Sequence, residues 1–262
     1  MKIGSMNDPT NNLIDEINIF GNIGLDYLDL TVEYPEATPE KILSNENKIK
    51  NSLSKFNLTL MGHMPWYFQI AYPYEEVRKS VLKETERIIG VLPKFDIQKI
   101  TLHPDPLPIQ NRKLRNKVFQ KTADSIKYIN KLCNDNNITL SIENFTEEKL
   151  STDELKVLFE KIPELRMTLD IGHGNLDFKN GERIFNLINT FREKIIHCHV
   201  HDNRGKEDEH LPIGAGYIDW PKVTKAIKNI GYDDTFTLEI HANDREYLKI
   251  SKEKFLNFWN KN

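Results

Sequence analysis

The stretch 195-IIHCHVHDN-203 carries an imidazole at every second position up to residue 201, with apolar side chains between them. Successive side chains of a β-strand point to opposite faces, so this spacing predicts a strand with one polar and one apolar face. The stretch 166-RMTLDIGHG-174 repeats the alternation, and its polar face ends in Asp170. We expect the apolar faces to meet helices and the polar faces to line the inside of a closed sheet.

The same alternation organises the whole chain, because short β-rich segments are separated by longer amphipathic segments. Candidate strands and helices in strict alternation predict parallel β/α units. An open doubly wound sheet would normally carry a glycine-rich turn after its first strand, whereas residues 6–9 read MNDP. Since 262 residues also suit the ~250 residues of one barrel, we predict an α/β fold, a single (β/α)8 TIM-barrel domain spanning residues 1–262.

The bounds of the expected elements follow from these patterns. The expected strands are residues 2–5, 27–32, 58–63, 99–103, 139–143, 166–170, 195–201 and 235–241. The expected helices are residues 11–20, 39–56, 75–92, 112–136, 152–161, 181–192, 220–230 and 245–260.

Composition narrows the class of protein. A formal net charge of −3 gives no general attraction to nucleic acid, although a local basic patch stays open. Cys133 and Cys198 give no disulfide framework, and no segment approaches the ~20 apolar residues of a membrane span. The N-terminus reads as a strand and lacks the apolar core of a signal peptide. We therefore expect a cytoplasmic protein that makes no membrane contact, of undetermined oligomeric state.

Residues that can bind a metal recur at or near the ends of the predicted strands three to eight. Active sites of (β/α)8 barrels lie at this C-terminal end, so residues far apart in the sequence should converge there. Buried carboxylates and imidazoles are costly to crowd together unless a cation compensates them. Mixed nitrogen and carboxylate ligands suit zinc, manganese, iron or cobalt better than calcium or magnesium. The candidate ligands are His63, His103, Glu143, Asp170, His173, His199, Asp208, His210 and Glu239.

Each of these residues also has a structural interpretation when taken alone. Asp170 could cap the turn before Gly172, and a single histidine at a strand end is usually a hydrogen-bonded structural residue. The recurrence at six consecutive strand ends favours a metal site over independent structural roles. His197, below His199 on the polar face, is expected in the barrel core, whereas His201 could lie behind the ligands or face a substrate.

The motifs resemble those of the xylose-isomerase-like barrels. This superfamily unites sugar and sugar-phosphate isomerases and epimerases with the family-two apurinic endonucleases. The matching segments are 62-GHMPW-66, 102-LHP-104, 142-IEN-144, 169-LDIGH-173, 199-HVHDN-203, 208-DEHLPIGAG-216 and 238-LEIH-241. Together they cover the predicted strands three to eight, and in this order and spacing they indicate the superfamily without selecting one activity.

The two branches imply different sites. By resemblance to the epimerases, Glu143, Asp170, His199 and Glu239 would hold one ion, both glutamates would move protons, and His173 would bind substrate. By resemblance to the endonucleases, all nine candidate positions would hold three zinc ions. The endonuclease branch usually continues its strand-five motif with a Thr-Ala-Gly-like turn, whereas residues 144–148 read NFTEE here.

The sequence therefore predicts a metal-dependent isomerase or epimerase of carbohydrate metabolism, acting on a sugar or sugar phosphate by proton transfer next to a carbonyl. Glu143 and Glu239 are the expected acid/base pair, and the cofactor is expected to be one to three divalent ions, zinc or manganese. Besides His173, the expected substrate contacts are Trp66, Arg204 and Lys206. The alternative is a zinc-dependent apurinic/apyrimidinic endonuclease that hydrolyses phosphodiesters at abasic DNA, which would need a basic rim around the site.

Overall fold

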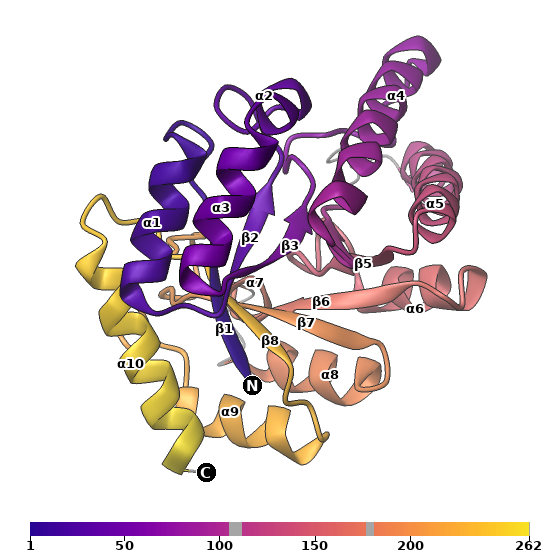
Figure 1. Cartoon of the computed structure of the whole chain (residues 1–262). Helices are drawn as coiled ribbons and strands as arrows, with labels where there is room; N and C mark the ends of the chain where they lie inside the picture. Colours follow the sequence, from indigo (N-terminus) through magenta and orange to yellow (C-terminus); the bar gives the residue numbers. More distant parts are fainter. Residues whose placement is uncertain (105–111, 177–180, 262) are drawn as a thin grey trace.

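The computed structural model describes residues 1–104, 112–176 and 181–261 of the chain (Figure 1). Within these residues, eight parallel strands form one closed barrel in which each strand pairs with the next in sequence. The first strand, β1 (Lys2–Met6), also pairs with the last, β8 (Thr235–Leu238), and this pairing completes the ring. The predicted TIM barrel is thus confirmed.

The other elements alternate around this ring, with the helices on the outside (Figure 1). The remaining strands are β2 (Tyr27–Thr31), β3 (Thr59–His63), β4 (Lys99–Leu102), β5 (Thr139–Glu143), β6 (Arg166–Asp170) and β7 (Ile195–Val200). The helices are α1 (Leu13–Ile23), α2 (Pro39–Ser44), α3 (Glu46–Phe56), α4 (Glu75–Val91), α5 (Arg112–Asp135), α6 (Thr152–Lys161), α7 (Ile171–Gly174), α8 (Glu182–Phe191), α9 (Trp220–Asn229) and α10 (Glu246–Lys261), and a 3-10 turn, η1 (Leu92–Phe95), follows α4.

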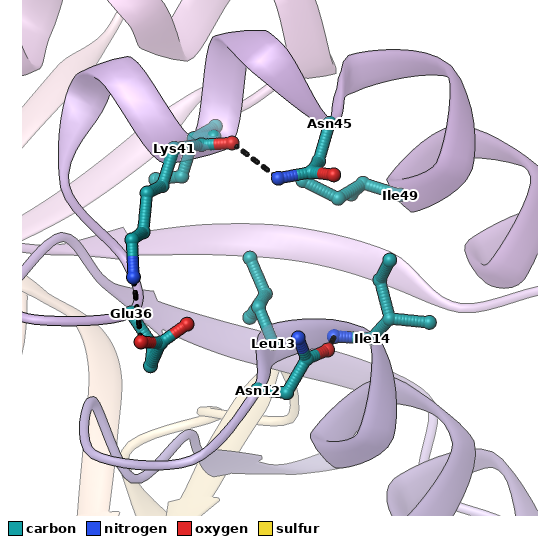
Figure 2. A pocket seen from close by; sticks show the side chains of 8 residues that line it. Asn12, Leu13, Ile14, Glu36, Lys41, Asn45 and Ile49 are labelled. Carbon is teal, nitrogen blue, oxygen red and sulfur yellow. Dashed lines mark hydrogen bonds and ion pairs between the residues drawn. The ribbon is translucent and has the colours of Figure 1, made fainter.

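The helix expected at residues 39–56 is two helices, which is a correction to the sequence-based prediction. The break lies at Asn45, whose side chain donates a hydrogen bond of 2.9 Å to the Lys41 carbonyl (Figure 2). An Asn side chain competes with the helical backbone in this way, so the chain turns before α3 begins. The pocket in Figure 2 is only about 30 Å³, room for about one water molecule.

The inside of the barrel contains a layer of polar side chains below the strand ends, which we call the inner layer. On one side, the Thr168 hydroxyl lies 2.9 Å from that of Thr101 and 2.7 Å from that of Ser141. On the other side, hydrogen bonds connect Tyr27 and Thr237 (2.9 Å) and Thr237 and Asp29 (2.8 Å). All of these residues are buried. As expected, His197 belongs to this layer, with its Nε2 at 3.2 Å from Asp29 Oδ2.

The register of the strands brings their polar ends to one rim. Asp170 of β6 lies opposite His199 of β7, and Glu143 of β5 lies opposite Thr168. Strand β8 ends at Leu238, three residues before the expected end, yet the Glu239 amide still donates to the Val200 carbonyl at 3.2 Å. The rim therefore receives a titratable side chain from several strands at the same level. Among the described helices, none is long and apolar enough to cross a membrane.

Candidate metal centre

Four buried residues converge on one point at the rim, and we call them the core site: Glu143, Asp170, His199 and Glu239. The Nδ1 atom of His199 lies 3.1 Å from Glu143 Oε2 and 3.0 Å from Glu239 Oε1. The Oδ2 atom of Asp170 lies 3.9 Å from the same nitrogen. These residues come from β5, β6, β7 and the segment directly after β8, so the site depends on closure of the barrel.

The donor atoms of the core site are not satisfied by the protein. Within the part of the chain that the structure describes, both carboxylate oxygens of Glu143, Asp170 Oδ2 and His199 Nδ1 are buried without a hydrogen-bond partner. Unpaired buried polar atoms are rare and costly, so a convergent group of them indicates a missing partner. Three carboxylates and one imidazole nitrogen fit a divalent transition-metal ion.

Asp170 combines the two roles that the sequence left open. Its Oδ1 accepts a hydrogen bond of 2.5 Å from the His173 amide and caps the short helix α7. Its Oδ2, the atom without a hydrogen-bond partner, faces the core site. The cap fixes the carboxylate plane, so the structural role orients the candidate ligand.

His63 and His103 extend the core site on the side of β3 and β4. Their Nε2 atoms lie 3.6 Å and 3.2 Å from Glu143 Oε2. The Nδ1 of His63 lies 2.7 Å from the Met64 carbonyl, which can only accept, so this nitrogen carries the proton. The Nε2 lone pair of a neutral His63 therefore points to Glu143, as in a metal-binding histidine held by a backbone carbonyl.

A second group of side chains lies beside the core site, and we call it the rim cluster: His173, His201, Asp208 and His210. Asp208 Oδ2 lies 3.0 Å from His173 Nε2 and 3.1 Å from His210 Nε2. In both histidines the other nitrogen, Nδ1, faces a backbone carbonyl, that of Asn144 at 3.0 Å and that of Glu239 at 3.1 Å. This arrangement repeats that of His63, so the rim cluster could hold a further ion.

His201 belongs to the rim cluster although the sequence left its place open. It is fully buried, and neither ring nitrogen has a hydrogen-bond partner among the described residues. Its Nε2 lies 3.3 Å from Asp170 Oδ1 and 3.6 Å from Asp208 Oδ1. The ring fits against the backbone of α7, where a Cβ on Gly172 would lie 2.0 Å from His201 Cε1. Only glycine leaves room for this imidazole.

The loop after β7, which carries Asp208 and His210, is held by one buried aspartate. Asp202 accepts hydrogen bonds from the Gly214 amide at 2.8 Å and from the Trp220 indole at 2.9 Å. Both ends of the loop are thereby tied to the barrel. Asp208 and His210 therefore lie in a loop whose path is held by hydrogen bonds to Asp202.

Burial and the neighbouring charges shift the pKa values of the buried ionisable groups in opposite directions. Burial alone would raise the pKa of Glu143, but His103 and His199 hold this pKa well below its ordinary value. Burial alone would lower the pKa of His173, but Asp170, Asp208 and Glu143 raise this pKa well above its ordinary value. The pKa of Glu239 is likewise lowered, with burial opposed chiefly by His199. Without a bound cation, protons on His173 and His199 would balance the carboxylates.

A cavity of about 780 Å³ opens over the site. His63, His103, His173 and Glu239 contribute to its wall. Trp66, 62% exposed, contributes to the wall as well, at the place where the sequence predicted a substrate contact.

Arg204 and Lys206, the other expected substrate contacts, are exposed, and the described cavity lining includes neither. Arg204 forms an ion pair with Glu209 instead. Their contact with substrate stays a prediction that this placement does not favour. The cations in the cavity wall are Lys149 and Arg245, as far as the described residues go.

Asp29 is a residue of the centre that the sequence-based prediction missed. It lies in β2, below the core site, with Oδ2 at 3.6 Å from His199 Nε2. The alternation in 27-YLDLT-31 places Asp29 on the polar face, and this signal could have identified it. The prediction considered mainly strand ends, whereas Asp29 is the middle residue of its strand.

Comparisons with known proteins give the following similarities. The model of the family described as "Xylose isomerase-like TIM barrel" matches residues 21–256. "Uncharacterized protein MJ1311" of Methanocaldococcus jannaschii is 27% identical over 216 residues, which are 76% of this chain and 73% of that protein.

Solved structures are similar over the whole chain. The crystal structure of a D-tagatose 3-epimerase-like protein has a TM-score of 0.86 and 25% identity, covering 100% of this chain and 99% of that one. The crystal structure of D-psicose 3-epimerase in the presence of D-fructose has a TM-score of 0.80 and 17% identity, covering 98% of each chain. This similarity shows a shared fold alone.

Proposed function

The chain belongs to the xylose isomerase-like TIM-barrel family, and on this premise we propose that it is a divalent-metal-dependent isomerase or epimerase of a sugar or sugar phosphate. One observation carries the proposal: Glu143 and Glu239 lie within 3.1 Å and 3.0 Å of the same nitrogen of His199, in a site with unsatisfied metal-binding atoms. The cavity above is large enough for a monosaccharide. The name of the similar D-tagatose 3-epimerase-like protein supports the same reaction class.

The residues supply the parts that proton transfer next to a carbonyl needs. A bound divalent ion would act as a Lewis acid on the sugar carbonyl. The lowered pKa values of Glu143 and Glu239 keep both carboxylates ionised at neutral pH, and an ionised carboxylate can accept a proton from carbon. One glutamate removes the proton from the carbon next to the carbonyl. Since both carboxylates start ionised, the other glutamate would first take up a proton from solvent and then donate it to the enediolate, at the same carbon for an epimerase or at the neighbouring one for an isomerase. The first glutamate would release its proton to solvent at the end of the turnover.

Around this pair, the cavity wall would orient the substrate. His173 lies beside Glu143, with Nδ1 at 3.0 Å from Oε1, and would bind a sugar hydroxyl. Trp66 would form an apolar wall against the sugar ring or chain. Lys149 and Arg245 are the cations of the wall that could face a phosphate, but Arg245 is held by both oxygens of Glu16 at 2.8 Å.

The test is a substrate screen in deuterated water. Metal-loaded protein is incubated with free ketoses, aldoses and their phosphates, and NMR follows deuterium incorporation next to the carbonyl together with the products formed. We expect exchange at one carbon and a new epimer or isomer for one substrate class. Binding of metal without any exchange across the screen would contradict the proposal.

The endonuclease alternative is supported by the rim cluster, because six of the nine candidate ligands line one cavity and the other three, Glu143, Asp170 and His199, lie against them. Against it, the cavity wall carries the carboxylates of Asp8 and Glu33 besides those of the ligands, and its Arg245 is neutralised by Glu16. A DNA-binding rim would need cations to face the phosphates. An oligonucleotide with one abasic site, incubated beside the sugars, discriminates between the two reactions.

The number of ions, one to three, is part of the proposal, with zinc or manganese as the expected metal. Stripped protein is titrated with each metal, and bound ions are counted for wild type and for the double variant His103→Ala/His210→Ala. A count above one that falls in the variant supports further ions bound by His103, by His210 or by both. A count of one in both proteins limits the site to the core residues. A cytoplasmic location stays a prediction.

A further inference from the structure

Asp29 is a carboxylate enclosed at the centre of the barrel. It is fully buried, and its Oδ2 accepts a hydrogen bond of 2.8 Å from the Thr237 hydroxyl. The same oxygen lies 3.2 Å from His197 Nε2 and 3.6 Å from His199 Nε2. Its other oxygen, Oδ1, is buried and has no hydrogen-bond partner within the described chain. The residue therefore lies between the inner layer and the core site, with one acceptor still free.

The tautomer of His199 connects Asp29 to the metal site. The Nδ1 atom faces the three carboxylates of the core site, so a metal ion held there would take the Nδ1 lone pair. A neutral imidazole bound through Nδ1 carries its proton on Nε2. This Nε2 is buried without a hydrogen-bond partner in the described residues, and Asp29 is the carboxylate that faces it. The two atoms lie 3.6 Å apart, just beyond hydrogen-bond distance.

The hydrogen bonds of the inner layer do not account for a charge at this position. Thr237 needs only an acceptor, and His197 already has the Thr235 hydroxyl at 2.8 Å from its Nδ1. The oxygen of an amide would serve both as well as a carboxylate does. A buried carboxylate is costly unless a positive group compensates it, and an imidazole bound to a divalent ion is such a group.

We propose that Asp29 is the positioning residue of the metal centre: it accepts the His199 Nε2 proton, holds the ring with Nδ1 facing the core site, and strengthens metal binding. The proposal rests on the metal site of the proposed function but not on the substrate. Asp29 acts through His199 and contacts neither the ion nor the sugar.

The test measures metal affinity in the substrate-free protein by competition with a chelator. Asp29→Asn keeps the shape and an acceptor for Thr237 but removes the charge, and we expect the dissociation constant for zinc or manganese to rise about 10–100-fold. The matched control is Glu16→Gln, which removes the charge of another buried carboxylate, 1% exposed, that contacts no candidate ligand. Unchanged affinity in Asp29→Asn, or an equal loss in both variants, would overturn the proposal.

A second pair of variants covers the case in which Asp29→Asn does not fold. Thr237→Val removes the hydroxyl that holds Asp29 Oδ2, whereas Thr237→Ser keeps it. We expect weaker metal binding for the valine variant and nearly wild-type binding for the serine variant, and equal affinities would contradict the role of Asp29. Excess metal should restore most of kcat in Asp29→Asn, which a merely structural defect would not allow. If wild type binds metal but turns over no sugar, the proposed reaction fails while this test still stands.

Discussion

The inner layer and the core site are two sets of polar residues, one above the other, inside the same barrel. In the inner layer, the hydroxyls of Thr101, Ser141 and Thr168 satisfy one another across neighbouring strands. In the core site, by contrast, Glu143 and His199 approach each other to 3.1 Å, and yet the oxygens of Glu143 and the Nδ1 of His199 have no hydrogen-bond partner in the described structure.

Both layers derive from one sequence pattern, a polar residue at every second strand position, but they differ in composition. Hydroxyls can donate and accept, so the hydroxyls of Thr101, Ser141 and Thr168 satisfy one another, whereas Asp29, the carboxylate of the inner layer, keeps a buried oxygen without a partner in the described structure. Ionised carboxylates only accept hydrogen bonds, so three of them around one imidazole require a nearby positive charge to be stable. The difference teaches that the type of polar side chain, rather than its placement, separates the structural layer from the candidate site. The following predictions test this separation.

The largest expected effect follows from a change to the proton-transfer pair. Glu239→Gln keeps the volume of the side chain but removes the base, so we expect kcat to fall about 10²–10⁴-fold in the deuterium-exchange assay. The melting temperature should change little by comparison. Glu154→Gln is the matched control, since a glutamine still completes the cap with Ser151 at the start of α6. Turnover of Glu239→Gln at the wild-type rate would remove this residue from the mechanism.

A metal ion bound at the core site should stabilise the protein. An ion at a hundredfold excess over its dissociation constant contributes about 2.7 kcal/mol, which corresponds to a rise in Tm of roughly 5–10 °C. We expect this rise in wild type and its loss in His199→Asn. Calorimetry of stripped and loaded protein measures both. Retention of the full rise in His199→Asn would place the ion elsewhere.

The unfolding free energy of the metal-free protein should depend on pH because of the histidines. The pKa values of His173 and His199 are raised above the ordinary 6.5, against the effect of burial, by the surrounding carboxylates. A histidine whose pKa is raised in the folded state contributes its full stabilisation of the fold below pH 6.5. This contribution is lost as the pH rises through the raised pKa. In the metal-loaded protein the metal has replaced these protons, so the unfolding free energy of the loaded protein should not fall over this pH range.

Urea unfolding over a series of pH values, with chelator or with metal present, compares the two forms. The difference between loaded and stripped protein should widen as the pH rises above the ordinary histidine pKa. Parallel pH profiles for the two forms would contradict the assignment of the histidines as ligands.

The smallest effect is expected in the inner layer. Thr168→Val removes the central hydroxyl of the chain that joins Thr101 and Ser141, and we expect a loss of about 1–2 kcal/mol in unfolding free energy. Metal affinity should be unchanged, and Thr168→Ser, which keeps the hydroxyl, should be close to wild type. A change in metal affinity without a change in stability would show that these three hydroxyls are not separate from the core site.

The sequence predicted the barrel and the rim for a definite physical reason. Side-chain alternation in strands is a local property, so 139-TLSIE-143 and 166-RMTLD-170 were placed at their observed bounds. Once the strands are parallel and closed into a ring, their ends must share one rim. The convergence of Glu143 and Asp170 therefore required no knowledge of individual contacts.

Loops and breaks were harder to predict because they depend on contacts between side chains and distant backbone. Asn45 divides an otherwise continuous amphipathic segment by bonding to Lys41. Arg204 follows the motif residues closely in sequence, yet it pairs with Glu209 and lies outside the cavity lining. His201 could be placed only when the path of α7 was known, because α7 supplies the surface against which the ring packs.

The close fit between Gly172 and His201 also limits how this sequence can evolve. A Cβ at position 172 would lie 2.0 Å from Cε1 of the fully buried His201, so the ring or the backbone would have to shift. A substitution of Gly172 would fit best beside a smaller residue at position 201. The two positions, 29 apart in the sequence numbering, are therefore expected to change together.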